Sequence, residues 1–201
     1  MYPRRRLLLA CTPLLALGGI AVYAALKLAP ASFETVATAA QASPVGGPFE
    51  LVDHTGRTVT DRTFRGTLML IYFGYSSCPD LCPTSLGDLA AALNLLGPSA
   101  EQVSFLFITV DPARDTPAHL AGYVGLFHPR LIGLSGSETQ CAQVARAFRV
   151  YVRFVPSAEH EGYIVDHSSF AYLVAPDGRL LTAFPHGTPP ETIAEAMRRA
   201  L

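Results

Sequence analysis

The strongest constraint on the fold comes from a continuous run of apolar residues at 68–73 that leads directly into a short loop with two cysteines. An apolar run of this length is typical of a strand that is buried on both faces, as in a parallel sheet. Pro83 closes the loop, and leucines and alanines then recur at helical spacing until Gly97-Pro98. The chain therefore places two cysteines between a central strand and the start of a helix.

Strands and helices continue to alternate along the rest of the chain. Apolar patterns predict strands at 49–52, 103–110, 131–134, 150–155, 170–174 and 180–184, and helices at 83–96, 117–127, 138–148 and 190–200. The turn sequence at 175–178 joins the last two strands into a hairpin. This alternation predicts an α/β domain in which a mixed sheet lies between helices, a three-layer sandwich. The strand, cysteine loop and helix at 68–96 make it thioredoxin-like.

The N-terminus carries a separate signal, a long stretch without charge. Three arginines occupy positions 4–6, and no charged residue follows until Lys27. About 20 apolar residues are needed to cross a bilayer, and arginines before such a stretch place the N-terminus in the cytoplasm. We therefore predict a cytoplasmic tail at 1–6, a transmembrane anchor at 7–29, a flexible linker at 30–47 and an extracytoplasmic domain at 48–201.

Two other interpretations of the N-terminus stay open. Ala37-Thr38-Ala39 fits the cleavage site of a secretory signal peptide, but the apolar region of such a peptide is typically about 7–15 residues, shorter than this stretch. The second is a lipid on Cys11, which is disfavoured because only a few apolar residues precede it. The simpler interpretation is that Cys11 is a small apolar residue of a membrane helix. The length of the apolar stretch favours an uncleaved anchor.

Composition limits the function classes. The chain has 201 residues, which suits one domain and an anchor. Its formal net charge of −1 provides no broad basic surface, so nucleic acid is not an expected partner.

The cysteine loop has the sequence Cys78-Pro79-Asp80-Leu81-Cys82-Pro83. Because a proline disfavours the helical conformation in the residue before it, Cys82 is predicted at or near the N-cap, with Pro83 as the first helical residue. The partial positive charge of a helix N-terminus favours thiolates there. Two thiolates can serve reversible disulfide exchange or bind a soft metal such as Cu(I). A purely structural disulfide here would close only a short loop and constrain the unfolded chain little.

A third metal ligand would have to come from elsewhere in the chain, and six histidines are available. His167 stands just before the strand at 170–174, and the segment that enters this strand in a thioredoxin-like sheet runs past the cysteine loop. His160, in the loop at 156–162, is the second choice. The others are predicted to be remote from the loop or exposed: His54 in a turn, His119 and His128 beside a helix, and His186 after the last hairpin.

Three segments together resemble the SCO/SenC family of copper metallochaperones: FGYSSCPDLCP at 73–83, VDPARDTP at 110–117 and VDHSS at 165–169. They occur in the family's order, and the likeness covers most of residues 48–201. The combination is specific, whereas two cysteines at this spacing alone would be a weak signal. One position differs, because the family often has a histidine immediately before the first cysteine and this chain has Ser77. That position does not belong to the family's metal ligands.

The resemblance implies a thioredoxin-like fold and a copper ion bound by Cys78, Cys82 and His167. Two thiolates and one imidazole suit Cu(I) and can also hold Cu(II). It further implies a role in maturing the copper centre of cytochrome c oxidase. The expected partners are the copper-accepting subunit of the oxidase, other copper carriers and thiol–disulfide proteins. The expected location is the bacterial inner membrane, with the domain on the periplasmic side. Under this interpretation the protein is a metallochaperone and not primarily an enzyme.

Other functions for the cysteine pair remain. The main alternative is an extracytoplasmic thiol–disulfide oxidoreductase that uses Cys78 and Cys82 as a redox pair to reduce the acceptor's cysteines. A peroxidase of related fold would need a low-pKa cysteine but no histidine ligand. Structural zinc is disfavoured because closed zinc sites normally have four ligands.

Three aspartates and one further cysteine complete the predictions. Asp111 and Asp166 either orient ligands or bind a partner; alternatively, Asp111 starts a turn and Asp115 caps the following helix. Cys141 shares a helix face with apolar residues and is predicted to be a buried core thiol.

Overall fold

The computed structural model describes residues 45–160 and 162–201, which contain a seven-stranded mixed sheet and a separate two-stranded hairpin. The order in the sheet is β2-β1-β5-β4-β3-β8-β9. These strands are β1 (Glu50–Asp53), β2 (Thr58–Thr60), β3 (Leu68–Gly74), β4 (Val103–Thr109), β5 (Leu131–Ser135), β8 (Phe170–Val174) and β9 (Leu180–Pro185). The helices are α2 (Leu81–Asn94), α3 (Pro117–Val124), α4 (Glu138–Ala147), α5 (Pro190–Ala200) and the 3-10 helices η1 (Asp61–Phe64) and η2 (Gly97–Gln102).

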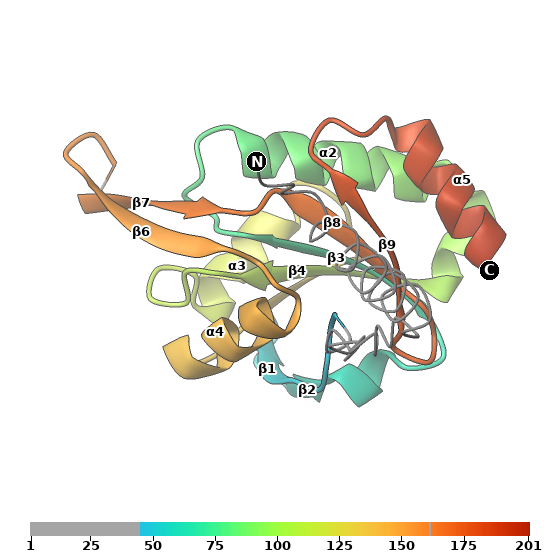
Figure 1. Ribbon diagram of the computed structural model, residues 1–201, viewed down its shortest axis with the longest axis horizontal. Coiled ribbons are helices and arrows are strands. Elements are labelled where there is room, and N and C mark those ends of the chain that lie inside the picture. The colour runs from blue at the N-terminus through green and yellow to red at the C-terminus, as the bar shows by residue number, and fades with distance from the viewer. Residues whose placement is uncertain (1–44, 161) are drawn as a thin grey trace, which may run out of the picture. The chain divides into compact units, whose positions relative to one another are not determined.

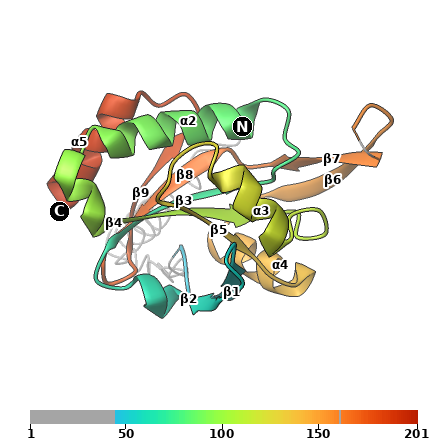
Figure 2. The same ribbon diagram turned by 180° about the vertical axis from the view of Figure 1, so that it is seen from behind.

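The centre of the sheet follows from the apolar run at β3. Strand β3 pairs in parallel with β4, β4 in parallel with β5, and β8 runs antiparallel to β3. Every residue of β3 is buried, as expected for a continuous apolar strand covered on both faces. Figures 1 and 2 show α2 and α5 side by side on one face of the sheet and α4 on the other. The predicted mixed α/β arrangement of three layers is confirmed.

The helix after the cysteine loop begins earlier than predicted. Helix α2 starts at Leu81 with Asp80 as its N-cap, so Cys82 lies in the first helical turn and Pro83 is not the first helical residue. The Thr84 N–H donates to the Asp80 carbonyl at 3.3 Å. Pro83 fits in this turn because its missing N–H falls among the first backbone groups of a helix, which have no intrahelical acceptor.

The hairpin of β6 (Val152–Ser157) and β7 (Gly162–His167) was only half predicted, because the sequence analysis assigned no strand to 162–167. Its register pairs Ser157 with Gly162 near the turn and Val152 with His167 at the base. Figure 1 shows the hairpin extending away from the sheet. The mixed polar and apolar sequence of β7 lacks the continuous apolar run that identified β3, which explains why the strand was missed.

Helix α4 carries the predicted buried face. Cys141, Val144, Ala145 and Phe148 are all buried, and Cys141 is 2% exposed. The prediction that Cys141 is a core thiol is therefore confirmed.

The anchor predicted at 7–29 lies outside the described residues, as does most of the linker predicted at 30–47. Among residues 45–160 and 162–201, no helix has the length and apolar character needed to span a bilayer.

Candidate metal centre

The two cysteines come together because the chain turns sharply between β3 and α2. The Cys78 N–H donates to the Tyr75 carbonyl at 3.2 Å, which closes a tight turn directly after the strand. The Cys82 N–H, in the first turn of α2, points back to the Cys78 sulfur at 3.4 Å. Cys78 is half-buried and Cys82 is fully buried, and neither is part of a disulfide. The helix N-terminus thus faces the Cys78 sulfur with a backbone donor, as the sequence predicted.

His167 reaches the same point from the end of β7. Its Nε2 lies 3.4 Å from the Cys82 sulfur, and its Nδ1 lies 3.0 Å from the Ser168 carbonyl oxygen. A carbonyl can only accept, so Nδ1 carries the proton of the neutral ring and Nε2 presents its lone pair to the sulfurs. The rings of Tyr72 and Tyr75 stand edge-on to the imidazole, with centroids at 6.5 and 5.9 Å. These contacts fix the imidazole orientation.

The side chains of Cys78, Cys82 and His167 form a compact group of ligand atoms. Their two sulfurs and one ring nitrogen all lie within 4.8 Å of one another. No second group of this kind occurs in the part of the chain that the structure describes. Two thiolates and an imidazole form a soft donor set, which fits Cu(I) better than the hard cations Mg²⁺ and Ca²⁺.

The two thiols differ in acidity because they share a hydrogen bond. The Cys82 thiol, acting as a donor, holds the pKa of Cys78 well below its usual range, and the backbone N–H groups of Asp80 and Cys82 lower it further. The reverse holds for Cys82, whose pKa is raised by its bond to Cys78 and by burial. The metal-free site therefore holds one thiolate, on Cys78, and one thiol, on Cys82.

This asymmetry predicts different reactivities for the cysteines. Cys78 should react with iodoacetamide at neutral pH and below, with a midpoint well under the value of about 8.5 of a free cysteine. Burial raises the pKa of Cys141 to about 12, so this thiol should react only on unfolding. Mass spectrometry of alkylated peptides over a pH series measures both. Fast labelling of Cys141 in the folded protein would contradict its assignment to the core.

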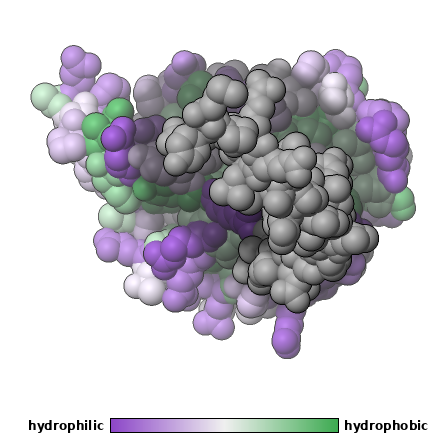
Figure 3. Space-filling view, viewed as in Figure 1, coloured by the Kyte–Doolittle hydropathy of each residue, from purple (hydrophilic) through white to green (hydrophobic). Residues whose placement is uncertain are grey.

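Cys78 and His167 also face a groove. It has a volume of about 310 Å³ and lies between the cysteine loop and the β6–β7 hairpin. Leu81 and Asp80 belong to one wall, and Val155 and Ile164 to the other, whereas Cys82 is not part of the lining. Figure 3 shows the hairpin end of the molecule with apolar and polar side chains next to each other. One sulfur and the imidazole are thus accessible from the groove, while the second sulfur lies behind them.

The other histidines are not part of this group. His160 lies at the turn of the hairpin, at the opposite end from His167, with its Nδ1 3.3 Å from the Ser157 hydroxyl. His54 accepts a hydrogen bond from the Gly133 N–H, His128 contacts Asn94, and the exposed His186 contacts Ser85. These positions agree with the sequence analysis.

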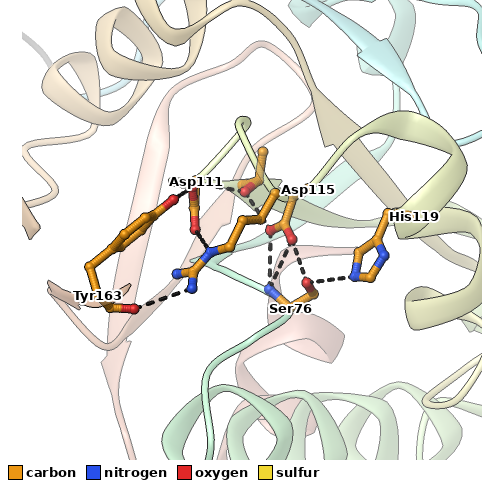
Figure 4. Close-up of polar contacts among 7 residues, drawn as sticks. Ser76, Asp111, Asp115, His119 and Tyr163 are labelled. Carbon is orange, nitrogen blue, oxygen red and sulfur yellow. Dashed lines mark hydrogen bonds and ion pairs between the residues drawn. The ribbon is translucent and has the colours of Figure 1, made fainter. Parts of the chain in front are cut away.

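His119 requires a correction, because it was predicted to be remote from the cysteine loop. Its Nε2 lies 3.0 Å from the Ser76 hydroxyl, two residues before Cys78 (Figure 4). The prediction was wrong because it treated α3 as distant, although parallel pairing of β3 with β4 brings the loops after both strands to the same edge of the sheet. That topological rule could have found the contact.

The aspartates have clear structural partners. Asp111 accepts a hydrogen bond from the Tyr163 hydroxyl at 2.9 Å and forms an ion pair with Arg114, while Asp166 is exposed and pairs with Arg153 at 2.9 Å. Asp115 does not cap α3, so this part of the alternative interpretation is wrong. The cap is Thr116, whose side chain accepts from the His119 N–H, because the Asp115 carboxylate turns inward to other donors (Figure 4).

Close packing behind Cys82 leads to a stability prediction. A Cβ added at Gly74 would lie 3.0 Å from the Cys82 sulfur and 3.0 Å from the Phe107 ring. We expect Gly74→Ala to lower the free energy of unfolding by about 1–3 kcal/mol, as overpacking does, and to weaken metal binding by displacing Cys82. The control Gly87→Ala, where nothing lies within 4 Å of the added Cβ, should be neutral or stabilising by up to about 1 kcal/mol. Urea denaturation compares them, and equal stability of the two variants would contradict the prediction.

Comparison with known proteins identifies relatives over the described domain. The SCO1/SenC family profile matches residues 37–201. The chain is 46% identical over 161 residues to the mitochondrial protein SCO2 homolog of Bos taurus, an alignment that covers 79% of this chain and 60% of that protein. The structure of Bradyrhizobium japonicum ScoI with copper bound is similar at 43% identity and a TM-score of 0.73, covering 78% of this chain and 99% of that one. Yeast Sco1 with copper bound is similar at 37% identity and a TM-score of 0.72, covering 78% and 87%.

Proposed function

Because this chain belongs to the SCO1/SenC family, we propose that it is a copper metallochaperone that binds one copper ion through Cys78, Cys82 and His167. The observation that carries the proposal is the convergence of two sulfurs and one imidazole nitrogen within 4.8 Å. Copper-bound relatives with 43% and 37% identity and the same fold support copper as the metal.

The asymmetry of the site supports an ordered transfer of the metal. Cys78 and His167 line the groove, whereas Cys82 is fully buried behind them. An acceptor thiolate that enters the groove therefore meets a copper ion flanked by its two accessible ligands. Exchange at Cys78 and His167 comes first, and the bond to Cys82 is the last to break. Copper passes between proteins in this way without release to solvent.

The metal also changes the protonation of the site. Copper binds thiolates, and the metal-free pair holds one proton on Cys82. Loading must therefore release that proton, and the Nε2 of His167 already faces the sulfurs. Only one proton has to leave the cysteine pair, which favours loading at neutral pH.

The family and the N-terminal sequence support a proposal for the acceptor and the location. We propose that the recipient is the copper-accepting subunit of cytochrome c oxidase. The predicted anchor at 7–29 would hold the chain in the bacterial inner membrane, with the domain on the periplasmic side. Domain and acceptor would then share one compartment.

A second candidate function rests on the acidity of Cys78. A thiolate with a resolving thiol beside it can reduce a disulfide of the acceptor. The Cys78 thiolate attacks one acceptor sulfur and releases the other as a thiolate. Cys82 then attacks the mixed disulfide, its proton passes to solvent or to the released thiolate, and the acceptor becomes a dithiol as Cys78 and Cys82 become oxidised. A separate thiol reductant must restore the pair for each further cycle.

Copper content and transfer test the proposal directly. The protein is loaded with Cu(I) under reducing conditions, freed of unbound metal and analysed by mass spectrometry. We expect one copper per chain and transfer of that copper to the acceptor domain. A variant with Cys78→Ser and Cys82→Ser should take up none. A chain that restores oxidase assembly in cells but binds no copper would contradict the metallochaperone and support the reductase.

A further inference from the structure

The loop that carries Cys78 is hydrogen-bonded to a buried carboxylate, that of Asp115, which is not one of the proposed metal ligands. Asp115 is 0% exposed and accepts a hydrogen bond from the Ser76 backbone N–H at 3.0 Å and another from the Ser76 hydroxyl. Thr109, at the end of β4, donates its hydroxyl to the same carboxylate at 2.6 Å. Two of the three donors thus come from one residue, Ser76, which lies two positions before Cys78.

The charge of Asp115 is not balanced by a cation. Arg114, its neighbour, pairs with Asp111 instead, and Asp115 forms no ion pair within residues 45–160 and 162–201. Burial raises the pKa of Asp115, while the donated hydrogen bonds oppose this shift. A buried carboxylate without a counterion is costly for stability, and a buried hydrophobic side chain would serve the core better. Because this carboxylate is hydrogen-bonded to the cysteine loop, we expect it to serve the structure of that loop.

His119 adds a contact from the solvent side. The Ser76 hydroxyl has one hydrogen, which it donates to Asp115, so it must accept from the His119 Nε2–H at 3.0 Å. Figure 4 shows Ser76 between the carboxylate of Asp115 and the imidazole of His119. The Ser76 side chain is fixed from both sides, and its backbone N–H is fixed as well.

We propose that Ser76 is a positioning residue for the copper site, and that the Asp115–Ser76–His119 network sets the place of Cys78 before the metal arrives. This inference rests on the proposed copper-binding function. Ser76 anchors the start of the turn whose other end is closed by the bond from the Cys78 N–H to the Tyr75 carbonyl. With that anchor in place, the Cys78 sulfur meets Cys82 and His167 without reorganisation of the loop. Binding then loses less conformational entropy, and the Cys78–copper bond keeps one geometry.

Two adjacent serines provide a matched test. Ser76→Ala removes the hydroxyl that links Asp115 to His119, whereas Ser77→Ala removes an exposed hydroxyl of the same loop that has no hydrogen bond in the described structure. We expect Ser76→Ala to weaken copper binding by about 10–100-fold, the range for residues that orient a ligand. It should also shift the absorption band of thiolate-bound Cu(II). Ser76→Thr keeps a hydroxyl and should restore both the copper affinity and the position of the absorption band. Ser77→Ala should match the unmodified protein in both measurements.

A second readout needs no metal. The Ser76 amide donates to the Asp115 carboxylate, and Asp115→Ala removes this acceptor. Hydrogen exchange of the Ser76 amide in the metal-free protein should therefore accelerate in Asp115→Ala, while amides of the distant strand β9 keep their protection. If the unmodified protein binds no copper, the proposed function fails and the exchange rates still test the network. If Ser76→Ala binds copper with unchanged affinity and spectrum, or Ser77→Ala causes an equal loss, the positioning role of Ser76 is wrong.

Discussion

Replacing His167 with alanine is expected to weaken copper binding by more than about 100-fold, because even residues that only orient a ligand change metal affinity by about 10–100-fold. The imidazole supplies the only nitrogen of the proposed site, and its Nε2 lies 3.4 Å from the Cys82 sulfur. Its loss leaves two sulfurs and an open position. Competition with a chelator of known Cu(I) affinity measures the change.

His160→Ala is the matched control for this variant. His160 lies on the same hairpin but at its turn, where it contacts Ser157 rather than the cysteines. We expect copper affinity to be unchanged by this replacement. If His160→Ala weakens binding and His167→Ala does not, the assignment of the third ligand is wrong.

The same His167 variant separates metal transfer from disulfide reduction. Disulfide exchange between Cys78 and Cys82 needs two sulfurs and no third ligand. His167→Ala should therefore retain a cysteine pair that cycles between dithiol and disulfide, while failing to support oxidase assembly in cells. Full restoration of assembly by a variant that has lost copper binding would overturn the metal-transfer mechanism.

The parts of the fold that the sequence predicted well are those decided by continuous local patterns. Strand β3 is a run of apolar residues, and every one of them is buried. The final helix, predicted at 190–200, was located by its helical spacing and matches α5 (Pro190–Ala200). In both cases the burial of a segment is visible in the apolar pattern of that segment, without reference to any other part of the chain.

The features that the sequence did not predict depend on contacts between distant segments. Asp115 has the residue type and position of a helix cap, yet its carboxylate turns inward because Ser76 and Thr109 supply buried donors. His119 contacts Ser76 across 43 positions of sequence, and no local pattern encodes that distance. The two cysteines were predictable because the same short loop contains both. His167 could be ranked above His160 by its place before β8, but its 3.4 Å approach to Cys82 depends on the register of the β6–β7 hairpin.

Oxidation of the cysteine pair is expected to abolish copper binding reversibly, the second large effect that the site predicts. The sulfurs of Cys78 and Cys82 are close enough that a small movement would allow a disulfide, and a thiolate with an adjacent thiol is a suitable pair for exchange. A disulfide has no thiolate to offer, so only His167 would remain as a ligand.

The experiment uses oxidised glutathione as the oxidant and then a reductant. Two electrons and the one proton of Cys82 leave the pair on oxidation, and glutathione takes up the electrons as it is reduced. Copper uptake should fall from one ion per chain to almost none. Addition of dithiothreitol should restore it fully. Cys141→Ser is the control, because this buried thiol on α4 is not part of the ligand group and its loss should leave both states unchanged. The oxidised protein could still bind stoichiometric copper with Cys78 and Cys82 shown by mass spectrometry to be joined. In that case the two sulfurs are not the ligands, and the metal site lies elsewhere in the chain.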